Sequence, residues 1–143
     1  MTVLVETVGR LLGLRSRMSS RLDLARMIRE GLPQGAAERV KGLLDLNDRE
    51  LAAAMGVSQK TVSRLRKSPA ARVNPVAGDR LYRMARLYAL ATTVTGGEEP
   101  ARAWLRSPQF GLAGQTPLES MLTEAGAREV EDLLGRIEHG VLA

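Results

Sequence analysis

The side chains best suited to chemistry lie in residues 51–67, which read LAAAMGVSQKTVSRLRK. When the second half of this stretch is placed on a helix, Val62 and Leu65 point to one side and four polar or basic side chains point away from it, with Gln59 near the leading edge. Amide, hydroxyl, ammonium and guanidinium groups can reach base edges or phosphates in a major groove. We expect the first three of these five at base edges, Lys67 at a phosphate and Arg64 at either. The five candidate DNA-binding residues are Gln59, Lys60, Ser63, Arg64 and Lys67.

Two short helices joined by a glycine would present these side chains. A small residue is needed where the helices touch, and Ala52 supplies it; the turn needs a positive φ, which Gly56 tolerates. Apolar residues would hold both helices to the domain: Leu51, Met55, Val57, Val62 and Leu65. The pattern predicts a helix-turn-helix. Its alternatives are a solvated face of a bundle helix or a helix-turn-helix used only for protein contacts. Because one such helix contacts few base pairs, we expect a homodimer on a two-fold site.

Catalytic chemistry finds little support in the sequence. His139 is the only histidine, cysteine is absent, and no carboxylates show a metal-ligand or acid/base spacing. The segments GGEEP and FGLAG lack the pattern of a phosphate-binding loop, and no predicted strand precedes either. His139 near a helix C-terminus is more typical of a cap that the helix dipole favours. We therefore expect no enzyme, no metal site and no cofactor.

Charge divides the chain into two parts. Residues 1–96 carry 17 Lys or Arg and 8 Asp or Glu, whereas residues 97–143 carry 4 Arg and 8 Asp or Glu. A basic part suits a polyanion, and an acidic part would be repelled by one. The division favours two parts with two partners, against the alternative that solvated charges are simply distributed unevenly.

Helical periodicity dominates, so we predict an all-α fold. Ser20, Asn47, Ser58 and Thr116 are expected as N-caps, Gly31 as a helix stop and residues 68–76 as a linker. The predicted helices cover 3–12, 21–30, 33–44, 48–55, 59–67, 76–95, 99–106, 117–126 and 127–138.

These elements predict four regions. Residues 1–20 form an N-terminal arm or short helix, 21–75 the helix-turn-helix domain, 76–96 a connecting helix and 97–143 a second helical domain. The arm and the connecting helix are both candidates for the dimer surface. The N-terminus does not resemble a signal peptide, and no stretch approaches the roughly 18 apolar residues of a membrane span. We expect a soluble cytoplasmic protein.

The second domain carries a more specific pattern. The segment from Trp104 to the end contains Trp-Leu before a proline-ended helix, then Gly114, Thr-Pro-Leu-Glu at 116–119, Gly126 and a closing RIEHGV. It resembles the toxin-binding domain of the Xre/MbcA/ParS antitoxins. Upstream, LDLARMIREGLP and DRLYRMARL resemble the same family, so the resemblance runs from about Leu22. Two features depart from it: LAGQTP replaces the more common two glycines and basic residue, and His139 replaces a frequent aromatic.

This resemblance implies the antitoxin of a type II toxin–antitoxin pair. Its partner would be a RES-domain toxin, an ADP-ribosyltransferase-like enzyme that degrades NAD or modifies a target with it. The antitoxin would cover the toxin's active site, and the NAD chemistry would belong to the toxin. The residues expected at the toxin are half-buried Trp104 and the chain end: Arg136, Glu138, His139, Gly140, Val141 and Leu142.

Three functions follow from these patterns. The first is a DNA-binding antitoxin that represses its own operon. The second is a stand-alone dimeric repressor whose C-terminal half only dimerises. The third is an antitoxin whose helix-turn-helix no longer binds DNA.

Overall fold

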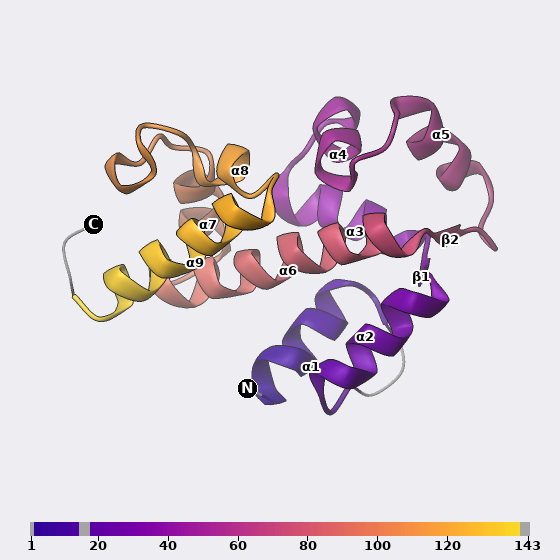
Figure 1. The fold of residues 1–143 in the computed structure, drawn as a ribbon, viewed down its shortest axis with the longest axis horizontal. Helices are drawn as coiled ribbons and strands as arrows, with labels where there is room; N and C mark the ends of the chain where they lie inside the picture. The colour runs from indigo at the N-terminus through magenta and orange to yellow at the C-terminus, as the bar shows by residue number, and fades with distance from the viewer. Residues whose placement is uncertain (1, 15–17, 141–143) are drawn as a thin grey trace. The chain divides into compact units, whose positions relative to one another are not determined.

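The computed structural model describes residues 2–14 and 18–140. In these residues the regular structure is helical apart from two strands of two residues each, which confirms the predicted all-α class (Figure 1). The chain forms two compact units, Met1–Arg86 and Leu87–Ala143, here called unit 1 and unit 2. The division falls within one long helix. Because no charged residue lies in residues 87–96, unit 1 has the same 17 basic and 8 acidic residues as the predicted basic part.

Unit 1 is built from helices that bury Leu, Val, Ala and Met. The first helix contributes Val5 and Val8 to this core and packs against the next two α-helices; Leu12, directly after the helix, is also buried. Its elements are α1 (Thr2–Leu11), α2 (Arg21–Glu30), β1 (Leu32–Pro33), α3 (Gly35–Leu44), α4 (Asp48–Met55), α5 (Gln59–Lys67), β2 (Arg72–Val73) and the first part of α6 (Pro75–Thr95).

Unit 2 contains the rest of α6 and a group of shorter helices. Tyr88 of α6 is almost fully buried, and its hydroxyl donates a 3.0 Å hydrogen bond to Glu98. Burial and this hydrogen bond both raise the pKa of Tyr88. The remaining elements are α7 (Glu98–Leu105), the 3₁₀ helix η1 (Phe110–Leu112), α8 (Pro117–Ser120) and α9 (Glu124–Glu138).

The predicted N-caps are confirmed. Each cap side chain accepts a hydrogen bond from a backbone N–H group that has no partner within its helix. Ser20, Asn47 and Thr116 each accept from the backbone N–H three residues later, and in all three cases the residue there returns a carboxylate to the cap. Ser58 accepts from the Thr61 N–H at 3.1 Å. The predicted stop of α2 is also confirmed, with Gly31 at φ 100°.

The expected helix start at Pro33 is wrong. Pro33 lies in β1, whose Leu32 and Pro33 pair antiparallel with Val73 and Arg72, and α3 begins only at Gly35. The expected linker over 68–76 is correspondingly wrong in part, because residues 72 and 73 form β2. Strands of two residues are too short for an alternating pattern to reveal them.

The expected helix boundary at Gly126 is also wrong. The helix that begins after Thr116 ends at Ser120, and Thr123 caps a new helix that contains Gly126 in its first turn. A Cβ at Gly126 would lie 1.9 Å from the carbonyl oxygen of Ser120. Glycine is present here for the close approach of two backbones and does not terminate the helix.

Candidate nucleic-acid interface and partner surface

The turn between α4 and α5 depends on Gly56. Its φ of 71° and ψ of 32° are left-handed, and its N–H bonds to the carbonyls of Ala52 and Ala53. An added Cβ would also lie 2.6 Å from Nη1 of Arg80, which extends from α6 to this turn. The predicted requirement for glycine is therefore confirmed, and the contact with Arg80 gives it a second cause that the sequence did not reveal.

Helix α5 presents its polar side outward. Val62 is buried and Leu65 half-buried, as the wheel predicts for the inner side. Arg64 donates a 3.2 Å hydrogen bond to Thr61 on the same helix. The five candidate DNA-binding residues are all exposed: Gln59, Lys60, Ser63, Arg64 and Lys67. Such a row of exposed donors can contact bases and phosphates; the role of each residue stays a prediction.

Arg66 lies on the same helix but pairs with carboxylates of its own unit, a role that the sequence did not reveal. Its Nη2 lies 2.8 Å from Oδ1 of Asp48 and 3.0 Å from Oε2 of Glu38, and its Nη1 lies 3.2 Å from Oδ2 of Asp48. Nζ of Lys41 completes the group at 3.2 Å from Asp48. These four residues, here called the Arg66 clasp, join α5 to α3 and to the start of α4.

The clasp shifts the ionisation of its members. Hydrogen bonds from Arg66 and then Lys41 lower the pKa of Asp48 to about 2. The same carboxylates raise the pKa of Arg66 above its already high value. Asp48 is therefore ionised, and Arg66 charged, at any physiological pH. Separations of 18 and 28 residues along the chain gave no local pattern from which to predict the pairing.

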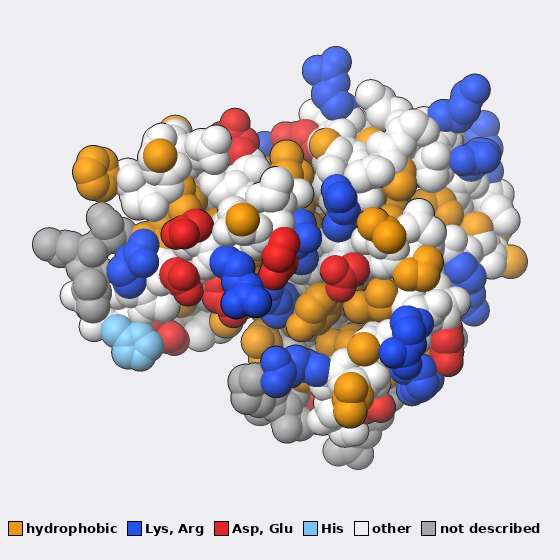
Figure 2. Space-filling model, viewed as in Figure 1, with side chains coloured by type: hydrophobic (Ala, Val, Ile, Leu, Met, Phe, Trp, Pro, Cys, Tyr) orange, Lys and Arg blue, Asp and Glu red, His pale blue; other side chains and the backbone are white. Residues whose placement is uncertain are grey.

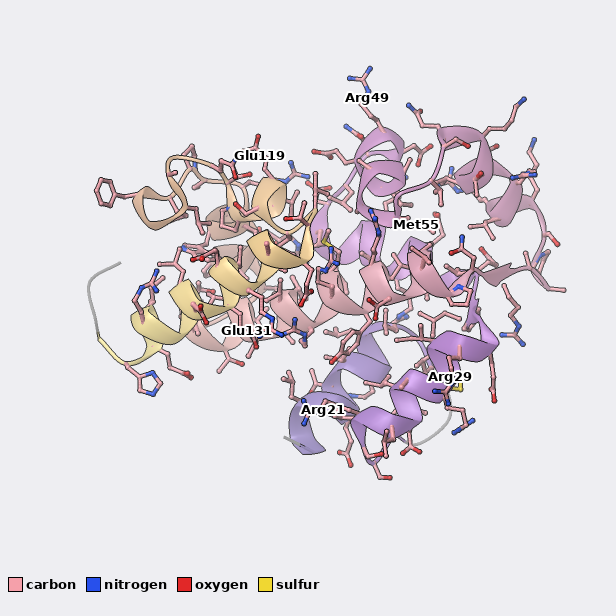
Figure 3. All side chains as sticks on the ribbon, in the orientation of Figure 1. Arg21, Arg29, Arg49, Met55, Glu119 and Glu131 are labelled. Atoms are coloured by element: carbon pink, nitrogen blue, oxygen red, sulfur yellow. The ribbon has the colours of Figure 1, made fainter. Side chains whose placement is uncertain are left out.

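Basic side chains extend beyond α5. Arg49, in the first turn of α4, is exposed and points away from the helix (Figure 3). Figure 2 shows Lys and Arg side chains gathered over the α4–α5 edge of unit 1. Because phosphate contacts supply most of the affinity for a duplex, this edge is the candidate nucleic-acid interface.

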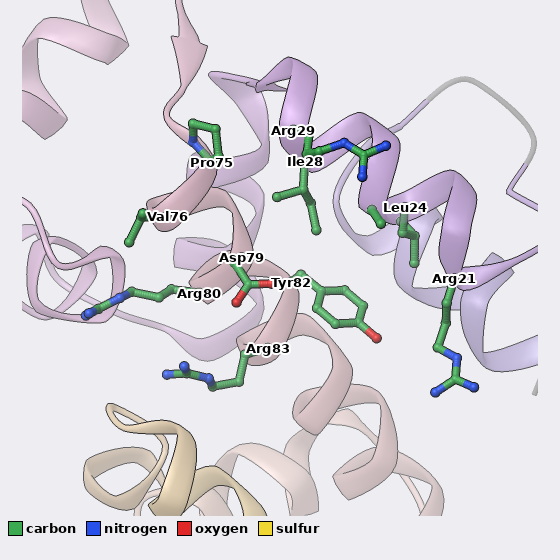
Figure 4. A pocket seen from close by; sticks show the side chains of 11 residues that line it. Arg21, Leu24, Ile28, Arg29, Pro75, Val76, Asp79, Arg80, Tyr82 and Arg83 are labelled. Carbon is green, nitrogen blue, oxygen red and sulfur yellow. The ribbon is translucent and has the colours of Figure 1, made fainter.

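Unit 1 also contains a groove between α2 and the start of α6, with a volume of about 680 Å³ (Figure 4). Its apolar lining includes Leu24, Ile28 and Tyr82. Four arginines, Arg21, Arg29, Arg80 and Arg83, line it together with Asp79. A two-fold contact through this groove would bring like charges together, so it is poorly suited to a symmetric dimer.

In unit 2 the predicted partner residues lie on α7 and at the end of α9. Trp104 and Arg136 are half-buried, whereas Glu138, His139 and Gly140 are exposed. The ring Nδ1 of His139 lies 2.7 Å from the carbonyl oxygen of Gly135, which fits a helix-end cap. Val141 and Leu142 lie outside the described residues.

In the part of the chain that the structure describes, no three His, Cys, Asp or Glu side chains are grouped so that they could hold a metal ion. No helix within residues 2–14 and 18–140 is long and apolar enough to cross a bilayer.

The α4–α5 pair, with its exposed basic second helix, defines a helix-turn-helix protein that carries an additional acidic helical unit. Two families match in that order. Residues 23–86 match the antitoxin Xre-like helix-turn-helix domain, and residues 90–140 match the antitoxin Xre/MbcA/ParS C-terminal toxin-binding domain.

Similar curated proteins are all described as "Antitoxin Xre". The one from Photorhabdus laumondii is 32% identical over 127 residues, which is 87% of this chain and 84% of that protein. The one from Yersinia enterocolitica is 35% identical over 95 residues, 66% of this chain and 64% of that protein. The one from Pseudomonas putida is 37% identical over 62 residues, 43% of this chain and 39% of that protein. The chain belongs to the Xre antitoxin family.

Proposed function

We propose that this protein is the antitoxin of a type II toxin–antitoxin system. Unit 2 binds and neutralises a RES-domain toxin, and unit 1 binds operator DNA and represses the operon. The observation that carries the proposal is the pair of family matches in this order on one chain, each on its own compact unit.

The DNA-binding part rests on the surface of α5. Five exposed polar or basic residues lie along it, Arg49 adds a cation from α4, and unit 1 has nine more basic than acidic residues. A positive surface of this kind accelerates association with DNA and supplies its affinity. We propose that a homodimer places two such helices in successive major grooves.

The toxin-binding part rests on unit 2, which has four more acidic than basic residues and would be repelled by DNA. We propose that the end of α9 and the residues after it cover the toxin's active site, where NAD would bind. The antitoxin itself contributes no catalytic group, and it acts in the cytoplasm, where operon and toxin are both present.

Co-expression with a RES-domain toxin as the proposed partner tests the proposal. The antitoxin is expected to restore growth, to co-purify with the toxin, and to abolish NAD consumption by the isolated toxin. Growth arrest that persists despite soluble antitoxin would contradict it. Operator binding, measured separately by gel shift, decides between this function and neutralisation without DNA binding.

A further inference from the structure

Unit 2 holds one aromatic side chain almost entirely in solvent. Phe110, the only phenylalanine of the chain, is 93% exposed. Among the unit's residues up to 140, the next most exposed large apolar side chains, Leu122 and Ile137, are only 37% and 36% exposed. Phe110 therefore adds little to the core of its own unit, so its packing does not account for a phenylalanine at this position.

The loop that carries Phe110 is tightly hydrogen-bonded. The N–H of Gln109 donates to the carbonyl of Gln115, and the N–H groups of Leu112 and Gly114 donate to the carbonyl of Gln109, each at 3.0 Å. The carbonyl of Phe110 itself accepts from Ala113 at 3.1 Å. These bonds close a compact turn with the aromatic residue near its tip.

The turn is also fixed to the body of unit 2. Leu112 is buried, and Nε2 of Gln109 donates to the carbonyls of Trp104 at 3.3 Å and Ser107 at 3.0 Å. Ala113 has a left-handed φ of 57°, which a residue with a Cβ adopts at some energetic cost. The fold thus holds the loop in one conformation with its phenylalanine outward.

We propose that Phe110 is an anchor that inserts into an apolar pocket on the toxin; this inference rests on the proposed function. A buried aromatic anchor typically contributes a large share of the affinity of an interface, and a loop held in its bound conformation loses little entropy on binding. The anchor lies on η1, a different element from the end of α9 that is proposed to cover the active site. The acidic charge of unit 2 makes DNA an unsuitable partner for this loop.

The single phenylalanine allows a direct measurement on the intact protein. Incorporation of 4-fluorophenylalanine gives one ¹⁹F resonance, from residue 110. In the free antitoxin this resonance is expected to broaden strongly with a soluble paramagnetic probe. On addition of the purified toxin it is expected to shift and to become protected from the probe. A resonance that stays exposed in a saturated complex would overturn the anchor.

Substitution gives the energetic test. Phe110→Ala is expected to raise the Kd for the toxin by about 30-fold or more, while thermal stability and operator affinity stay unchanged. The matched control is Leu22→Ala, which removes a 79% exposed apolar side chain from unit 1 and is expected to leave toxin binding unchanged.

The outcomes separate the anchor from the proposed function. If the wild-type protein binds toxin and Phe110→Ala binds equally well, the anchor is wrong and the antitoxin function stands. If the wild-type protein does not bind the toxin, the proposed function fails. If Phe110→Ala instead changes only the mass of the free antitoxin in light scattering, Phe110 joins two copies of this chain and the anchor is again wrong.

Discussion

Arg66, near the C-terminal end of α5, donates two hydrogen bonds, of 2.8 Å and 3.2 Å, to Asp48 at the start of α4. Helix α5 packs against α4, with Val62 buried and Leu65 half-buried. The ion pair joins the C-terminal half of α5 to the start of α4. We infer that it helps to set the direction in which Lys60, Arg64 and Lys67 point.

Asp48→Asn tests this positioning role. The substitution removes a negative charge and, by charge alone, would strengthen DNA binding. If the clasp orients α5, affinity for the operator is expected to fall a few-fold, while affinity for unrelated DNA stays the same or rises. Gel shifts on both duplexes measure the ratio of operator affinity to affinity for unrelated DNA.

The control for this variant is Asp79→Asn, which removes the same charge elsewhere in unit 1. Glu50 is unsuitable as a control because its side chain completes the cap with Asn47. Equal strengthening on both duplexes would show that the clasp has no orienting role.

The clasp also predicts a pH dependence. Because the folded-state pKa of Asp48 is about 2, below its usual 3.8, the pair stabilises the fold fully at pH values above the unfolded pKa. The stabilisation is lost as pH falls from about 4 toward 2. The difference in unfolding free energy between wild type and Asp48→Asn is expected to be constant from pH 8 to 5, to shrink as pH falls from about 4, and to vanish only below pH 2. Urea titrations at each pH measure it. Because the pair is exposed, added salt should reduce the difference at every pH.

Local sequence rules predicted most of the helices and their caps. Ser20, Asn47 and Thr116 act on backbone groups three residues away, so their effect is visible in a short window of sequence. The bonds of Arg66 to Asp48 and Glu38, the β1–β2 pair and the contact of Arg80 with Gly56 join residues 18 or more apart. They depend on the tertiary fold, which periodicity alone does not determine. Phe110 was missed because a single exposed aromatic has no sequence pattern.

Gly56→Ala is expected to destabilise unit 1 by about 1–2 kcal/mol. The backbone there has a φ of 71°, and the new methyl group would meet the guanidinium of Arg80. Gly42→Ala is the matched control, since Gly42 lies within α3 and no neighbouring atom lies within 4 Å of its added Cβ. It is expected to leave stability unchanged or to raise it by up to ~1 kcal/mol. Thermal unfolding of both variants measures the difference. Equal melting temperatures for Gly56→Ala and Gly42→Ala would contradict the requirement for glycine in the turn.

Gly126→Ala makes the corresponding test in unit 2. A Cβ there would lie 1.9 Å from the carbonyl oxygen of Ser120, and backbone cannot move aside as a flexible side chain can. We expect a loss of about 2–3 kcal/mol and, with it, weaker toxin binding at 37 °C. Gly135→Ala, on the same helix with nothing within 4 Å, is the control and should be neutral or mildly stabilising. Urea unfolding followed by circular dichroism measures both. A neutral Gly126→Ala would show that α8 and α9 move apart at little cost.

The basic side of α5 predicts a specific salt dependence. Replacing Lys60, Arg64 and Lys67 with Ala removes three exposed cations from the candidate interface. Each phosphate contact contributes about 0.9 to the slope of log K against log salt, so the slope should fall by up to about 3. Toxin binding should not change, because unit 2 is unaltered. Replacing Arg128, an exposed arginine of α9, provides the control and should leave the slope unchanged. Fluorescence anisotropy on labelled operator across a salt series gives the slopes. If the triple variant binds with the wild-type slope, α5 does not face the phosphates, and another surface of unit 1 must carry the DNA.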